Sequence, residues 1–96
     1  MKTIYDVADE LNARIEITRY PKQGRRFTAS LRIYTNVGST GFNLIGEKFD
    51  TLGAYGQGLS PKEAINDLTG MISGKAIEPT RSIFGGQYQC PILSCV

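Results

Sequence analysis

Residues 14–34 read RIEITRYPKQGRRFTASLRIY, and this stretch predicts a β-hairpin. Apolar and polar residues alternate on both sides of a Pro-Lys-Gln-Gly break, which is the period-two pattern of half-buried strands joined by a turn. Ile15 and Ile17 would then face the core. Pairing across the turn would bring Arg14 close to Arg32 on the opposite, outer face of the sheet.

Two helices are predicted to flank the strands. Thr3-Ile4-Tyr5-Asp6 has the capping-box pattern, and apolar residues at helical spacing extend this helix over about residues 4–13. Ser60-Pro61-Lys62-Glu63 combines an N-cap serine, a proline at the first helical position and a capping glutamate. The second helix should therefore begin there and stop near Gly74.

The expected fold is α+β, with the order α-β-β-β-α. Residues 42–49 are rich enough in β-favouring side chains for a third strand, and the glycine-rich segment 53–58 is expected to be a tight connection. Residues 1–74 would form a single domain, a three-stranded antiparallel sheet packed on two helices. Residues 75–96, rich in proline and glycine and without a clear period, are expected to be an irregular C-terminal tail that either folds back on the domain or covers a partner.

The composition argues against most catalytic and metal chemistry. The chain has no histidine, the commonest general base, and Cys90 and Cys95 could supply at most two of the four ligands of a structural zinc. The first six residues already include an acid, Asp6, and no long apolar run follows it. We therefore expect neither a secretory signal nor a membrane anchor, and we expect a cytoplasmic protein. We therefore expect a binding protein without catalytic residues, metal or cofactor.

The distribution of charge points to the kind of partner. The nineteen residues from Arg14 to Arg32 hold six of the eleven basic side chains and one acid, a net charge of +5. The other 77 residues carry −3. Such a polarity can direct a polyanion or an acidic protein surface to one face of a small domain, although a solvated sheet face paired with Glu16 would have the same composition.

The sequence resembles the double-stranded-RNA-binding domain over roughly residues 4–74. The resemblance rests on the element order, on the strand RFTASLRI at residues 26–33 and on GQGLSPKEA at residues 56–64, which is similar to the Gly-x-Gly-x-Ser-x-Lys-x-Ala entry of that family's last helix. It implies that Gly24 and Arg25 lie on a hairpin turn that enters a minor groove, and that Lys62 contacts phosphates. The chain departs from the family by having Pro61 before Lys62 in place of paired lysines.

Two hypotheses for function follow. In the first, the basic hairpin binds duplex or structured nucleic acid, with double-stranded RNA among the candidates. In the alternative, a small interaction or inhibitor protein of the phage or mobile-element type uses the same arginines and the tail against an acidic or nucleic-acid-handling protein. A homodimer through a sheet edge or the tail is compatible with both. The candidate binding residues are Arg14, Lys22, Gly24, Arg25, Arg26, Arg32, Tyr34 and Lys62.

Overall fold

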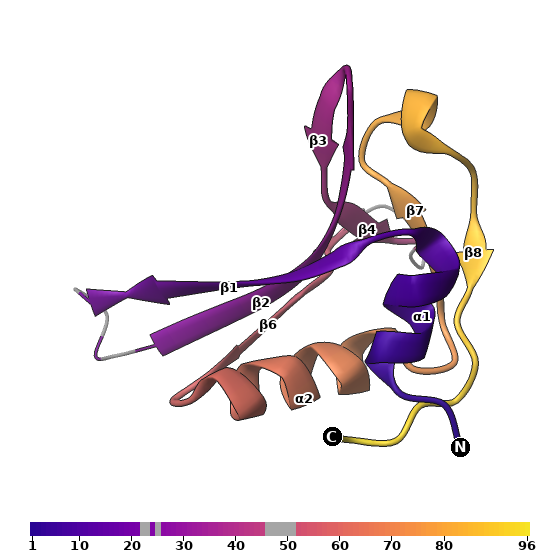
Figure 1. Cartoon of the computed structure of the whole chain (residues 1–96). Coiled ribbons are helices and arrows are strands. Elements are labelled where there is room, and N and C mark those ends of the chain that lie inside the picture. The colour runs from indigo at the N-terminus through magenta and orange to yellow at the C-terminus, as the bar shows by residue number, and fades with distance from the viewer. Residues whose placement is uncertain (22–23, 25, 46–51) are drawn as a thin grey trace.

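The structure is a computed structural model that describes residues 1–21, 24, 26–45 and 52–96. It has an α+β fold with two helices and antiparallel sheets, which confirms the predicted fold class (Figure 1). The elements are α1 (Ile4–Leu11), β1 (Arg14–Tyr20), β2 (Arg26–Thr35), β3 (Gly38–Thr40), β4 (Phe42–Leu44), β5 (Leu52–Gly53), β6 (Tyr55–Gly58), α2 (Pro61–Ile72), β7 (Ala76–Pro79), a short 3-10 helix (Ser82–Phe84) and β8 (Tyr88–Gln89).

The predicted hairpin is confirmed by the pairing of β1 with β2. All seven residues of β1 pair with β2, from Arg14 opposite Arg32 to Tyr20 opposite Arg26. Beyond Arg32, β2 continues into a second hairpin with β3, in which Thr35 lies opposite Gly38. The ten-residue strand β2 is therefore the central element of this part of the molecule.

Among the described residues this sheet has four strands, β1, β2, β3 and β6, where three were expected, and the strand beside the hairpin was predicted at the wrong place. The residues paired with β2 on the side away from β1 are those of β6, with Ala29 opposite Gly56 and Phe27 opposite Gly58. This segment had been assigned to a glycine-rich connection. Part of the predicted strand 42–49 is β4, which belongs to another sheet, and residues 46–49 lie outside the described residues.

Close packing against α2 explains why β6 contains glycines. Gly56 lies so close to α2 that a Cβ built on it would be 2.2 Å from the backbone nitrogen of Leu68 and 2.3 Å from the carbonyl oxygen of Ala64. A Cβ on Gly58 would be 2.5 Å from Cβ of Glu63. Strand and helix therefore touch backbone to backbone, which only glycine allows.

Both helices begin where the sequence predicts. The backbone nitrogen of Thr3 donates to Oδ2 of Asp6 at 2.7 Å, as in a capping box. At the start of α2, Oγ of Ser60 accepts from the backbone nitrogen of Glu63 at 3.1 Å. The apolar stripes of α1 and α2 pack with Ala29 and Leu31 of β2 into one core, so both helices lie on the same face of the β1-β2-β6 sheet (Figure 1).

The prediction of an irregular tail is wrong. Residues 76–79 and 88–89 form β7 and β8 of a second antiparallel sheet, ordered β5-β4-β7-β8. Part of the tail folds back on the domain, because Leu93 is buried in the common core together with Ile77 and Cys90. Ile83 and Ile92 remain exposed. No helix in the described part of the chain is long and apolar enough to cross a membrane.

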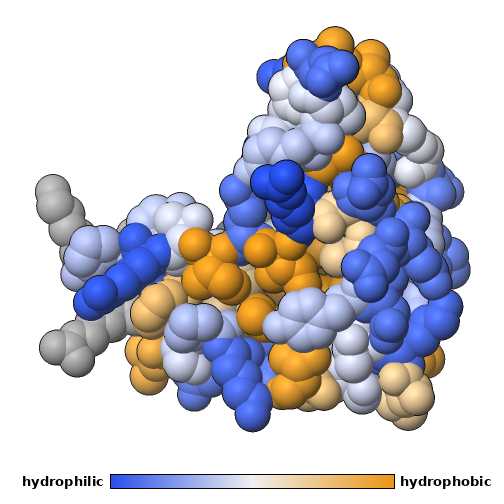
Figure 2. All heavy atoms as spheres, in the orientation of Figure 1, coloured by the Kyte–Doolittle hydropathy of each residue, from blue (hydrophilic) through white to orange (hydrophobic). Residues whose placement is uncertain are grey.

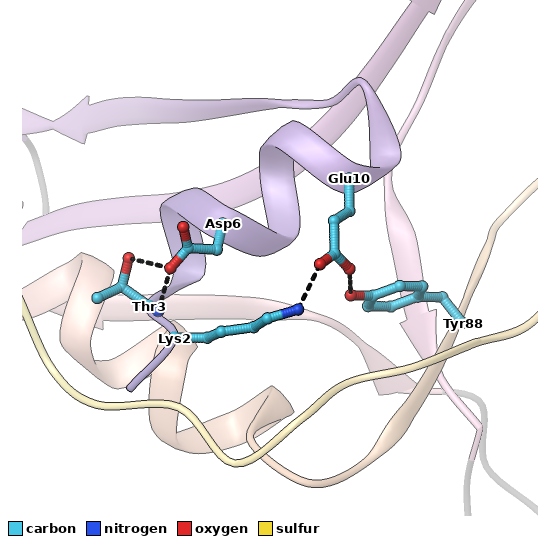
Figure 3. Close-up of polar contacts among 5 residues, drawn as sticks. All are labelled: Lys2, Thr3, Asp6, Glu10 and Tyr88. Carbon is cyan, nitrogen blue, oxygen red and sulfur yellow. Dashed lines mark hydrogen bonds and ion pairs between the residues drawn. The ribbon is translucent and has the colours of Figure 1, made fainter.

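A small polar cluster joins the first helix to the last strand (Figure 3). Nζ of Lys2 lies 2.6 Å from Oε1 of Glu10, and the hydroxyl of Tyr88 donates to the other carboxylate oxygen. The hydrogen bond from Lys2, and then that from Tyr88, lower the pKa of Glu10. Burial, followed by the hydrogen bond to Glu10, raises the pKa of Tyr88 to about 12.

Tyr88 should make the protein sensitive to alkali. Because the folded protein holds the Tyr88 proton more tightly than the unfolded chain, with its ordinary pKa of 10.0, this contribution to stability is complete below pH 10 and is lost as the pH rises towards about 12. We expect Tyr88→Phe to cost about 1 kcal/mol near neutral pH, because it removes a hydrogen bond. The difference from wild type should shrink as the pH rises.

Urea unfolding of both proteins between about pH 8 and about pH 12 tests this expectation. Cys90, whose pKa burial raises to about 11, also titrates in this range in both proteins, so the informative quantity is the difference between them. Tyr5→Phe, which removes an exposed phenol from α1, is the control and should have little effect on stability near neutral pH. A constant difference between Tyr88→Phe and wild type would contradict the assignment.

Candidate nucleic-acid interface

The face of the β1-β2-β6 sheet away from the helices is polar. Strand alternation sends Ile15 and Ile17 towards the helices and their neighbours outwards. On β6, Tyr55 lies opposite Ser30 and Gln57 opposite Thr28, so these two side chains join the same outer face. The outward residues of β1 and β2 are Arg14, Glu16, Thr18, Tyr20, Arg26, Thr28, Ser30, Arg32 and Tyr34.

The outer face is hollowed into a groove. Figure 1 shows the β2–β3 hairpin rising from one end of the sheet on the side away from α2, so that hairpin and sheet form a corner. Two adjoining concavities, of about 490 Å³ and about 380 Å³, follow this corner and share Ser30, Arg32 and Tyr55. Their volumes are in the range of ligand pockets in proteins.

The larger concavity runs along the sheet and the smaller one lies under the corner. The first is completed by Glu16, Thr18, Tyr20, Thr28 and Gln57. The second is completed by Ser39, Thr40, Gly41, Phe42, Asn43, Gly53, Ala54, Thr80 and Arg81. Thr80 and Arg81 reach this site because the backbone nitrogen of Thr80 donates to the carbonyl oxygen of Gly41 at 3.0 Å.

Arg32 is held at the centre of the groove. Its Nε lies 3.3 Å from Oε2 of Glu16, and its Nη2 donates to Oγ of Ser39 at 3.1 Å. A guanidinium has five N–H donors, so further donors remain for a ligand. Glu16 offsets part of the charge, which means that the outer face is partly the paired surface that the composition allowed as an alternative.

Tyr34 belongs to the same cluster. Its hydroxyl donates to Glu16, and this hydrogen bond is the main reason why the pKa of Tyr34 is raised. The guanidinium carbon of Arg14 lies 5.0 Å from the centroid of the Tyr34 ring, within the range of a cation–π contact. Glu16 thus holds both Arg32 and Tyr34 in place, and Arg14 stacks beside them.

The structure brings together some of the predicted site residues and separates others. Arg14, Arg26, Arg32 and Tyr34 share the outer face. Gly24 is exposed with a φ of +70° in the turn, whereas Lys22 and Arg25 lie outside the described residues. Arg19, which contributes to the basic segment, lies opposite Phe27 on the helix side.

Lys62 is placed apart from the groove. It lies exposed in the first turn of α2, on the other side of the sheet. The acids near it have a structural role, because Glu63 accepts from the backbone nitrogen of Leu59 and Asp67 from that of Gln57, each at 2.8 Å. These two carboxylates fasten the β6–α2 connection.

The groove also contains residues that the sequence did not single out. Tyr55 and Gln57 alternate with Gly56 and Gly58, a period-two pattern that could have indicated a strand with one polar face. Arg81 lies in the segment that was expected to be an irregular tail. It reaches the groove through the pairing of β7 with β4, so no local sequence pattern could have identified it.

Comparison with known proteins gives no further assignment. No match was found among protein families, curated proteins or solved structures.

Proposed function

We propose that the chain is a small non-catalytic module that binds structured nucleic acid across the outer face of β1-β2-β6, with unpaired bases on its tyrosine rings and phosphates on its arginines. One observation carries the proposal: arginines from three separate segments and several tyrosines share one hollowed face. Among the described residues that line the two concavities, Glu16 is the single acid. The residues concerned are Arg14, Arg26, Arg32, Arg81, Tyr20, Tyr34 and Tyr55.

The residue types suit both parts of a nucleotide. A guanidinium donates in a planar fork that matches phosphate oxygens, and Arg32 is already oriented by Glu16 and Ser39. Tyr20 and Tyr55 are exposed beside the groove, where their rings can stack on bases. Because a ring can stack only on a base whose face is free, the groove suits loops and single strands better than continuous duplex.

The duplex interface implied by the family resemblance would use another side of the molecule. It would include Lys62, which lies on α2 behind the sheet. A protein partner held by the tail has less support, because Leu93 is buried and Phe84 and Tyr88 are half-buried. The Lys62→Gln variant below distinguishes the duplex interface from the groove.

The proposal predicts a specific loss of affinity in Tyr55→Ala. We expect its dissociation constant for a labelled single-stranded oligonucleotide of about 12 nucleotides to rise about tenfold, since stacking contributes about 1–3 kcal/mol per base. Fluorescence anisotropy measures this, with RNA and DNA strands and a duplex of the same sequence in parallel. Tyr5→Ala is a matched control, because Tyr5 is 48% exposed and Tyr55 is 47% exposed, but Tyr5 lies on α1.

A second pair of variants separates the two sides of the molecule. Arg81→Gln should weaken binding and reduce the slope of log K against log salt by about one, whereas Lys62→Gln should change neither. If Lys62→Gln weakened binding, Arg81→Gln did not, and duplex bound more tightly than single strands, the site would lie on the helix side. That result would overturn the proposal. Absence of binding to every oligonucleotide would overturn it as well.

A further inference from the structure

We infer that the chain forms a homodimer by pairing its β1 strand with β1 of a second copy. The two outer edges of the β1-β2-β6 sheet differ in how they are protected. On the β6 side the edge strand has four residues, and Asp67 of α2 accepts from the backbone nitrogen of Gln57 at 2.8 Å. Short length and a covering element are usual protections of a sheet edge.

The β1 edge has neither protection. It is seven residues long and contains no proline, since Pro21 comes just after its end. Within the ranges that the structure describes, no hydrogen bond from another element reaches the backbone of residues 14–20 on the side away from β2. A free edge of this length presents a row of N–H and C=O groups that can pair with another strand.

The side chains beside this edge favour contact with an apolar surface. Ile17 is 38% exposed although it points to the helix side, where Ile15 is half-buried. Figure 2 shows hydrophobic surface in the middle of the view, next to the position of β1 in Figure 1, with hydrophilic surface on either side. A second β1 strand would cover Ile17.

The register follows from symmetry and from the sequence of β1. A two-fold axis perpendicular to the sheet places side chains of the same face opposite each other across the two strands. The axis must therefore pass midway between one residue and the same residue of the second copy. An axis at Glu16 would place two carboxylates directly opposite each other, and one at Thr18 would place Pro21, which has no N–H, opposite Ile15. An axis at Ile17 pairs all seven residues of the two strands.

This register also sets the neighbours of the two arginines of β1. It places Arg19 of each copy opposite Ile15 of the other, on the face where α1 packs. On the outer face, the guanidinium of Arg14 would lie opposite the Tyr20 ring of the second copy. The dimer would join the sheets of the two copies edge to edge with both grooves on one face, and it does not depend on nucleic-acid binding.

Sedimentation equilibrium without nucleic acid tests the dimer. Wild type should show a monomer–dimer equilibrium, and Ile17→Lys should raise the dimer dissociation constant at least about tenfold by placing two ammonium groups face to face. Ile83→Lys, at a highly exposed position in the 3-10 helix, is the control and should dimerise as wild type does. A wild-type protein that remains monomeric at all concentrations would overturn the inference.

Disulfide formation tests the register. Opposite residues of antiparallel strands have Cα atoms about 4.5–5.5 Å apart, a separation that a disulfide can span. In a Cys95→Ser background, Ile17→Cys should form a covalent dimer on mild oxidation, whereas Thr18→Cys should not. Circular dichroism verifies that both variants fold. Cross-linking through Thr18→Cys alone, or equally through both, would refute the pairing described.

Discussion

Replacing Gly56 with alanine is expected to destabilise the protein by about 3 kcal/mol or more, a shift in melting temperature of about 12 °C or more for a domain of this size. The new Cβ would lie 2.2 Å from the backbone nitrogen of Leu68 and 2.3 Å from the carbonyl oxygen of Ala64. Backbone atoms of a helix cannot move aside as a flexible side chain can. The alanine would therefore separate β6 from α2 or unfold both.

A matched substitution in α2, the helix that Gly56 contacts, should have the opposite effect. Gly70 lies inside α2 with no heavy atom within 4 Å of where its Cβ would be. Gly70→Ala should therefore stabilise the protein by up to about 1 kcal/mol, because alanine has the higher helix propensity and reduces the freedom of the unfolded chain. Thermal unfolding of both variants tests the pair. Equal, small effects would mean that β6 does not lie against α2 as described.

Truncating Leu93 to alanine is expected to cost about 2–4 kcal/mol, which is the second-largest effect that the structure predicts. Leu93 is 8% exposed and belongs to the core cluster that includes Ile72 and Ile77. Its backbone nitrogen also donates to Oγ of Ser73 at 2.8 Å, so the segment is held in place while the side chain is removed. The variant would leave a cavity that the rigid surroundings fill only in part.

The neighbouring residue provides the control. Ile92 is 67% exposed, and Ile92→Ala should change the free energy of unfolding by no more than about 0.5 kcal/mol. Urea titration of the two variants measures the contrast. If Leu93→Ala were as mild as Ile92→Ala, the side chain of Leu93 would not be part of the core.

The elements predicted well from the sequence are those that carry their own local signals. The hairpin of residues 14–34 has alternation on both strands and a turn between them, and α2 has its cap and proline. β6 was missed because Gly56 and Gly58 resemble a loop when read locally. Their reason is the close approach of α2, a tertiary contact that no propensity scale contains.

The second sheet could not be predicted for a related reason. β4, β5, β7 and β8 have two to four residues each, too few to establish a period. They are strands because they pair with one another across long separations, as when Phe42 lies opposite Pro79. Pro79 and the two glycines that follow it suggested an irregular segment, although a proline is tolerated at the end of a strand.

The candidate site shows the same division. Alternation along β1 and β2 correctly placed Arg14 and Arg32 on one face, because the period of a strand is a local property. The count of charged residues alone could not show that Glu16 pairs with Arg32 and accepts a hydrogen bond from Tyr34. Nor could it show that Arg19 points to the other face. Arg81 joins the groove through the second sheet, so it could be identified only from the folded chain.

The contact between the two ends of the described chain has a consequence for the order of folding. The backbone nitrogen of Ser94 donates to the carbonyl oxygen of Lys2 at 3.0 Å, across 92 residues, and Tyr88 reaches Glu10 in the same region (Figure 3). Contacts of such sequence separation form slowly, because closing a long loop costs entropy before any contact is gained. We therefore expect the β1–β2 hairpin to close early, whereas the contacts of the N-terminal segment with residues 88–94 should form later.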